Sequence, residues 1–173
     1  METYHDKPIR QSYCAAERLY AGEYPGDKGQ ERAIDKLKDF LAFGITHFVD
    51  LTEEGELTPY AHLLPEGVAH RRFPIVDVSV PDSCEQMQAV VDYINAALNS
   101  SPLAKVYVHC WGGVGRTGTV IGCYYAQQGC DFISALHKLR VNFKQCPKSE
   151  YRVSPETLEQ EIFISRYVDF KSL

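Results

Sequence analysis

A ten-residue stretch, HCWGGVGRTG at positions 109–118, combines residue types that together can bind and attack a phosphate group. Cys110 is a potential nucleophile, and Arg116 carries a planar guanidinium that matches two phosphate oxygens. Three intervening glycines permit a tight turn in which successive backbone N–H groups point inward. Such a loop binds an oxyanion, and the same positive elements favour the reactive thiolate form of Cys110.

The segments on either side of this stretch are those that would hold it in place. Residues 105–109 (KVYVH) are rich in β-branched and aromatic side chains and predict a short buried strand. A helix is expected from about Arg116 to near Gly129, and its first turn would add free N–H groups and a positive dipole end. The substrate-binding residues expected on this basis are Trp111, at the pocket mouth, Gly112, Gly113, Val114, Gly115 and Arg116.

The remaining chain alternates strand-like and helix-like segments. Helices are predicted over 31–43, over 83–99 with Ser83 and Gln86 at capping-box spacing, over 131–143, and from Ser154-Pro155-Glu156 to about 170. Strands are predicted over 45–51 and 68–76. This alternation indicates an α/β fold with a largely parallel central sheet flanked by helices, in a single domain covering residues 1–173.

Composition and charge set limits on location and partners. The 173 residues carry a net charge of −5 with mixed signs, which gives no footprint for nucleic acid or an anionic membrane. No apolar run could span a bilayer, and the polar N-terminus lacks a signal-peptide pattern, so we expect a soluble, cytoplasmic monomer. The six cysteines show no metal-binding spacing, and we expect neither a metal nor another cofactor.

Three other interpretations of the glycine-rich stretch compete with anion-assisted nucleophilic chemistry. A purely structural turn would leave the combination of Cys, Arg and three glycines without a purpose. Residues 113–118 match G-x-G-x-x-G between a strand and a helix, but this dinucleotide fingerprint normally opens its domain. A nucleotide-triphosphate loop is excluded because no lysine follows the last glycine.

The motif HCx5RTG at 109–118 resembles the signature of the protein tyrosine phosphatase superfamily, and the short chain is similar to the dual-specificity branch. The segment PIVDxxxP at 74–81 resembles the general-acid loop of that branch, which points to Asp77. The segment SPETxxQ at 154–160 is similar to a downstream segment of some small members. The resemblance covers residues 45–165 approximately.

The resemblance implies hydrolysis of phosphate monoesters through a phosphocysteine intermediate, with Asp77 as acid and then base. It also implies supporting roles for three residues: His109 orients the loop, Thr117 assists thiolate departure, and Gln160 places the second-step water. Asp82 is the rival acid, although a role at the start of the following helix is favoured for it.

The expected substrates are phosphoproteins, with phosphotyrosine first and phosphoserine or phosphothreonine as further candidates. Arg116 is the one side-chain cation evident between Cys110 and the end of the motif, which suits a single phosphate, although folding could bring Arg71 and Arg72 to the pocket rim. The alternatives are a phosphoinositide or other non-protein phosphatase, and a phosphate-dependent binding module with little turnover.

Overall fold

Five strands form one sheet at the centre of the computed structural model, which describes residues 6–173. The strands are β1 (Ser12–Ala16), β2 (Leu19–Gly22), β3 (His47–Asp50), β4 (Ala69–Arg72) and β5 (Val106–His109), in the spatial order β1-β2-β5-β3-β4. All neighbouring pairs are parallel except β1 and β2. Gly22 and Asp50 both pair with His109, so three strand ends meet at the same edge of the sheet.

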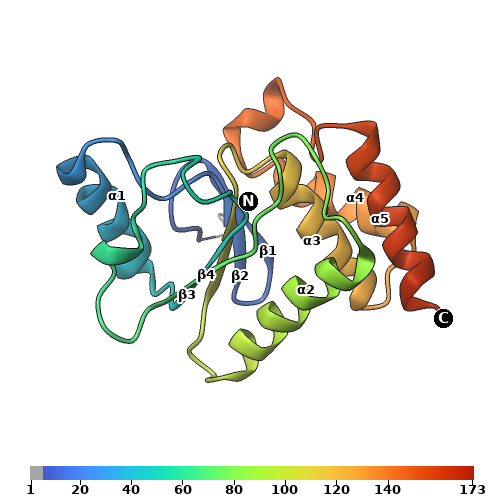
Figure 1. The fold of residues 1–173 in the computed structure, drawn as a ribbon, viewed down its shortest axis with the longest axis horizontal. Coiled ribbons are helices and arrows are strands. Elements are labelled where there is room, and N and C mark those ends of the chain that lie inside the picture. Colours follow the sequence, from blue (N-terminus) through green and yellow to red (C-terminus); the bar gives the residue numbers. More distant parts are fainter. Residues whose placement is uncertain (1–5) are drawn as a thin grey trace, which may run out of the picture.

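Helices cover both faces of this sheet (Figure 1). They are α1 (Gln30–Phe43), α2 (Cys84–Asn99), α3 (Gly115–Gln127), α4 (Phe132–Phe143) and α5 (Leu158–Lys171), with short 3-10 turns at Ala61–Leu63 and Pro147–Glu150. Figure 1 shows α1 on one side of the sheet and α2 to α5 on the other. Within residues 6–173, none of these helices is both long and apolar enough to cross a bilayer. The predicted α/β fold class is confirmed.

Each face of the sheet has its own hydrophobic core. The larger core joins the sheet to α2 to α5 and contains buried residues such as Val91, Val108 and Ile121. The smaller core lies under α1, where the rings of Phe40, Phe48 and Tyr107 pack edge to face. Cores on both faces fix the position of β5, the strand that leads into the glycine-rich loop.

The β1–β2 hairpin was not predicted from the sequence. Its strands are only 5 and 4 residues long, too short to show a periodic pattern. The side chain of Arg18, in the connecting turn, donates hydrogen bonds to the carbonyls of Leu98, Ser101 and Ala104. These partners are remote in sequence, so local reasoning could not find the hairpin. The predicted strand over 68–76 is also shorter, ending at Arg72.

The predicted start of the last helix at Ser154 was wrong. Helix α5 begins at Leu158, and Thr157 is its cap: the Thr157 hydroxyl accepts from Gln160 N, while the Gln160 side chain accepts from Thr157 N. The Ser154 hydroxyl is used elsewhere, because it donates to the carbonyl of Val114. The segment before α5 therefore supports the glycine-rich loop instead of starting a helix.

Candidate active site

The glycine-rich loop connects the end of β5 to the start of α3 and forms the floor of a cavity of about 340 Å³. Cys110 contributes its side chain to this floor and is only 4% exposed. The cavity is lined by Asp77, Val78, Cys110, Trp111, Gly112, Val114, Gly115, Arg116, Arg152 and Glu156. The strand, the loop and the helix thus lie as predicted, and most of the expected loop residues line one pocket.

The backbone of the loop is turned so that its carbonyls face the surrounding protein. Four carbonyls accept hydrogen bonds from outside the loop: Cys110 O from His109 Nδ1, Trp111 O from Tyr24 N, Gly112 O from Lys148 Nζ, and Val114 O from Ser154 Oγ. Within residues 6–173, no acceptor is bonded to the N–H groups of 111–116. These unpaired donors form an anion-binding nest beside the Cys110 sulfur.

Gly113 was expected to contact the substrate, but it does not line the cavity. It adopts φ +75°, and a Cβ atom there would overlap the carbonyl carbon of Gly22 at the end of β2. A side chain at residue 113 is therefore excluded by backbone conformation and by close packing. Gly113 therefore shapes the loop, and its backbone N–H is one of the unpaired donors of the nest.

Thr117 and His109 hold the sulfur and the backbone that carries it. The Thr117 hydroxyl, on the first turn of α3, donates to Cys110 Sγ at 3.1 Å. The buried His109 ring bonds the Cys110 carbonyl through Nδ1 at 2.9 Å and Tyr60 Oη through Nε2 at 2.6 Å. A carbonyl can only accept, so Nδ1 carries the proton and Nε2 accepts from Tyr60. Burial lowers the pKa of His109, which is consistent with this neutral form.

A polar network extends behind His109 to Asp50 at the end of β3. Burial alone would raise the pKa of Asp50, but hydrogen bonds from His70 and Thr52 hold it well below its usual range. Tyr60 and Asp50 were not predicted as site residues. Tyr60 and Asp50 precede His109 by 49 and 59 residues in the chain, and only the folded sheet brings them close to it.

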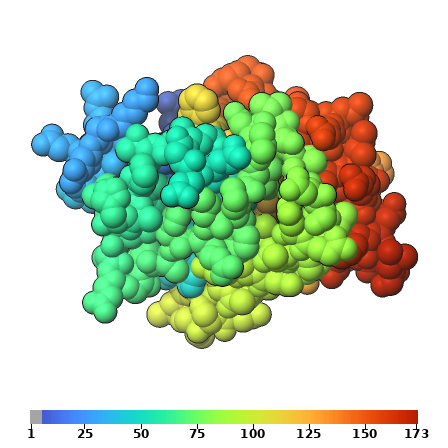
Figure 2. Space-filling view, in the orientation of Figure 1, coloured from blue at the N-terminus to red at the C-terminus, as the bar shows by residue number. Residues whose placement is uncertain are grey.

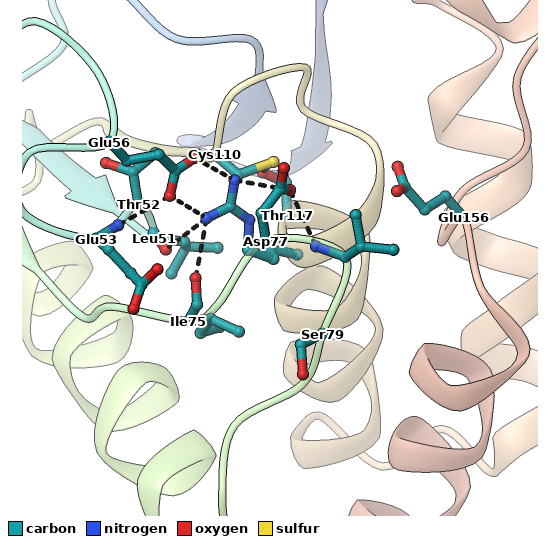
Figure 3. A network of polar contacts seen from close by, with 12 residues as sticks. Leu51, Thr52, Glu53, Glu56, Ile75, Asp77, Ser79, Cys110, Thr117 and Glu156 are labelled. Atoms are coloured by element: carbon teal, nitrogen blue, oxygen red, sulfur yellow. Dashed lines mark hydrogen bonds and ion pairs between the residues drawn. The ribbon is translucent and has the colours of Figure 1, made fainter.

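Arg116 is almost completely buried, with 1% of its surface exposed, and most of its donors are already bound. Nη1 donates to Glu56 Oε1 at 2.8 Å and to the Ile75 carbonyl at 2.9 Å, and Nη2 contacts Glu56 Oε2 at 2.7 Å and Asp77 Oδ1 at 3.0 Å. In Figure 3, dashed lines join Glu56, Ile75 and Asp77 to this guanidinium, which lies close to Cys110. Nε is buried and has no hydrogen-bond partner among the described residues.

Glu56 is the main site residue that the sequence analysis missed. Its hydrogen bonds from Arg116 hold the pKa of Glu56 below its usual range, so it is a carboxylate at neutral pH. A bidentate carboxylate of this kind fixes the plane of the guanidinium. Glu56 lies in the polar segment after β3, where three of the five residues from 52 to 56 are glutamates. Residue type alone therefore could not single out Glu56.

Asp77 lines the same cavity as Cys110 and the loop. Its carboxylate contacts Arg116 and accepts from Val78 N, while 53% of the side chain remains exposed. Asp82 does not line this cavity and borders a separate one with Pro81. Ser83 performs the capping of α2, because its hydroxyl accepts from Gln86 N, so Asp82 is not the cap either.

Two further charged residues, Arg152 and Glu156, line the cavity from the segment before α5. They form an ion pair at 3.0 Å, and Figure 3 shows Glu156 on the side of the site opposite Glu56. The expectation that Arg116 is the single cation of the pocket was therefore wrong. Arg152 follows the loop by more than thirty residues, too far for local sequence reasoning to place it there.

Gln160 lies behind the cavity and does not line it. Its side-chain oxygen accepts from the backbone of Glu156 and Thr157, and its amide donates to the carbonyl of Ser79. The residue thus joins the start of α5 to the segment that carries Asp77. This geometry supports a positioning role for Gln160 toward the acid segment more directly than contact with a water in the pocket.

Arg71 and Arg72 lie away from the cavity. The Arg71 guanidinium stacks over the rings of Phe73 and Tyr93, at 4.9 and 5.3 Å from their centroids. Arg72 donates to the backbone and the hydroxyl of Thr52. Neither arginine is available at the pocket rim.

Comparison with known proteins agrees with this geometry. Residues 27–161 match the family model described as "Swiss Army Knife protein, DSP-PTPase phosphatase domain". The protein provisionally named tyrosine phosphatase 067L, from Invertebrate iridescent virus 3, is 30% identical over 118 residues. That match covers 66% of this chain and 45% of the viral protein, so the aligned region spans less than half of the relative's length.

Solved structures give the same result for the fold. The crystal structure of Tk-PTP in its active form superposes with a TM-score of 0.74 at 25% identity, covering 92% of this chain and 97% of that one. The structure of PTPMT1 in complex with PI(5)P gives 0.71 at 16% identity, covering 94% and 97%. Since the family model spans most of the sequence, the chain belongs to the Swiss Army Knife family of dual-specificity-type protein tyrosine phosphatase domains.

Proposed function

We propose that this phosphatase hydrolyses phosphate monoesters on phosphoproteins, phosphotyrosine fastest, through a phosphocysteine intermediate on Cys110. The observation that carries the proposal is the position of the Cys110 sulfur on the floor of a nest of unpaired N–H groups, beside the unpartnered Nε of Arg116. One group of donors can therefore hold a phosphate dianion while the adjacent sulfur attacks it.

In the first step the Cys110 thiolate attacks phosphorus, the S–P bond forms, and the P–O bond to the leaving group breaks. Asp77 lines the same cavity as Cys110 and, in its protonated form, gives its proton to the departing oxygen. A phosphate oxygen would replace Asp77 Oδ1 on Arg116 Nη2 and a second would accept from Nε, so phosphate binding frees Asp77 for this task.

In the second step water attacks phosphorus and the S–P bond breaks. The Asp77 carboxylate takes the proton of the water, and the thiolate leaves with its charge stabilised by the hydroxyl of Thr117, 3.1 Å from the sulfur. The protein returns to its starting state with inorganic phosphate as the product. No step requires a metal, because the loop and Arg116 supply the positive field.

The shape and charge of the floor support a singly phosphorylated reacting group. Between Cys110 and Arg116 the loop carries no charged side chain, and the indole of Trp111, 60% exposed, offers a surface for an aromatic ring at the mouth. The second candidate is a phosphoinositide: Arg152 adds a cation at the wall, and PTPMT1 was solved with PI(5)P.

The direct test is turnover of p-nitrophenyl phosphate and a phosphotyrosine peptide in the presence of EDTA. The wild type should turn over both, and rapid acid quench with a ³²P-labelled peptide should trap label on Cys110. The Cys110→Ser variant should be inactive, whereas Cys130→Ser, outside the cavity, serves as the matched control. Lack of turnover by the wild type would favour a binding module instead.

A further inference from the structure

A second cavity lies directly beside the catalytic pocket. Its volume is about 770 Å³, larger than the 340 Å³ of the Cys110 cavity, and it is enclosed by the β2–α1 segment, the first turns of α1 and the loop after β3. Trp111 lines both cavities, so the two adjoin at this residue. Figure 2 shows the surface hollowed between the light-blue atoms around α1 and the cyan atoms of the loop after β3.

The charged residues of this second cavity leave two cations unneutralised. Lys28 and Arg32 have no ion pair or side-chain hydrogen bond with any residue in 6–173. Lys36, in contrast, is held by Glu23 and by the carbonyl of Tyr24. Lys28 and Arg32 therefore remain available to an incoming anion.

Two of the three acidic residues that line the same cavity are paired with cations. Glu23 is paired with Lys36 and with Lys148, and Glu56 is the bidentate partner of Arg116. Asp27 accepts from Gly29 N in the turn that leads to α1. The cavity thus has two cationic side chains without an ion pair against one such carboxylate, that of Asp27, and this excess of positive charge gives it a preference for anions.

We propose that this cavity binds a second acidic group of the phosphoprotein substrate, a carboxylate or a phosphate a few residues from the phosphorylated side chain. The proposal rests on the proposed function and names its substrate class more closely: phosphopeptide segments with a nearby Glu, Asp or second phosphorylated residue. Lys28 and Arg32 are the residues that recognise this group.

An extended peptide fits the two cavities better than a compact inositol ring. Because Trp111 lines both cavities, a ligand that occupies both must pass along this residue. A peptide advances about 3.3 Å per residue and can cross in a few residues. Tyr24, Leu57 and Pro59 line the second cavity and provide apolar contacts for intervening side chains.

The test is a set of peptides that each contain one phosphotyrosine flanked by Ala and Gly. In each peptide one Glu or one phosphothreonine occupies a different position, between four residues before and four residues after the phosphotyrosine. At the favoured position, the second anion should raise kcat/KM by about threefold to thirtyfold through a lower KM, as expected for contacts with two exposed cations. The advantage should decrease as salt increases. A soluble inositol bisphosphate and vesicles containing a phosphoinositide serve as competing substrates.

The variant Lys28→Ala/Arg32→Ala should reduce the ratio of kcat/KM between the acidic and the neutral peptide to about one. Lys38→Ala is the matched control, because Lys38 is an exposed cation on the same helix that does not line the cavity. Three outcomes would overturn the proposal. The first is an acidic-peptide advantage in kcat/KM below about twofold, and the second is an equal ratio in the wild type and the double variant. The third is a preference for the inositol substrates that depends on Lys28 and Arg32. Failure of the proposed function is separate, since it would appear as no turnover of the neutral peptide.

Discussion

The Cys110 loop and the segment that carries Asp77 line one pocket but differ in how they are held. Cys110, Arg116 and Thr117 are 4%, 1% and 0% exposed, and four carbonyls of their loop accept hydrogen bonds from neighbouring groups. The segment around Asp77 exposes 59% of Val76 and 52% of Val78. Exposed segments with few buried contacts open at low free-energy cost, so we expect the acid segment to open more readily than the floor.

This difference separates phosphate binding from proton transfer. The fixed side of the pocket holds the phosphate and the nucleophile in a preorganised geometry, which needs no reorganisation during the reaction. The exposed side must give a proton to one group and take it from another, and its contact with Arg116 must be exchanged for phosphate. Variants on the two sides should therefore fail in different ways.

The largest effect is expected on the fixed side, for Cys110→Ser. Turnover should fall below about one per cent of wild type, because a serine hydroxyl in this position is not ionised and cannot replace the thiolate. Phosphopeptide binding, measured by calorimetry, should persist, since the N–H nest and Arg116 are unchanged. Loss of binding together with turnover would show that the sulfur also shapes the loop.

On the exposed side, Asp77→Asn should lower kcat by roughly 10²–10⁴-fold for a phosphotyrosine peptide. The loss should be much smaller for aryl phosphates with strongly acidic leaving groups, which need little protonation. Asp82→Asn is the control, since Asp82 borders a different cavity and should retain near wild-type kcat. The reverse pattern in these two variants would identify Asp82 as the acid.

An intermediate effect is expected for Glu56→Gln, which weakens the support of the fixed side without removing a reacting group. The amide can keep one hydrogen bond to Arg116 but not the charge-assisted pair at 2.8 and 2.7 Å. A displaced guanidinium should cost about tenfold to a hundredfold in kcat/KM. Equal losses for good and poor leaving groups would assign the defect to phosphate positioning, whereas leaving-group dependence would assign it to Asp77.

The smallest effect concerns the pH dependence of stability. Burial lowers the pKa of His109 in the folded state. Below the unfolded pKa of about 6.5, the unfolded chain therefore binds a proton at this residue that the folded protein does not. The stabilisation is complete above that pH and is lost as pH falls toward the folded pKa, by at most about 1.4 kcal/mol per pH unit from this residue.

Urea unfolding at several pH values between 5 and 8 measures this slope. His109→Asn should show a shallower slope by up to one proton, while a matched substitution at the exposed His62 should leave the slope unchanged. Identical slopes in wild type and His109→Asn would mean that His109 is protonated in the folded protein. The lowered pKa of His47 contributes in the same direction and remains in both proteins.

The fixed side of the site was largely predictable from sequence because its parts are contiguous. Strand β5, the loop and the start of α3 occupy one short stretch, and glycine, cysteine and arginine have distinctive conformational and chemical properties there. Asp77 was located through a resemblance in its segment, and the structure places it in the same cavity. The α/β architecture followed from periodic patterns in the longer helices.

The remaining parts depend on contacts between distant segments. Glu56 and Arg152 are common surface residue types in polar stretches, and only the folded protein brings Glu56 to Arg116 and Arg152 to the cavity of Cys110. The same holds for Ser154, whose hydroxyl supports the loop instead of capping α5. Local propensity cannot distinguish these residues from others of their type, because their partners are set by tertiary structure.

The close contact of Gly113 with Gly22 links the order of folding to the appearance of the active site. Strand β2 lies next to β5 although more than eighty residues separate them in the sequence, and the loop conformation at Gly113 is complete only when the end of β2 lies against it. Contacts of such long sequence separation form slowly, because chain entropy must be lost before they are made. A nascent or partly unfolded chain would therefore have its helices before it has a phosphate-binding loop.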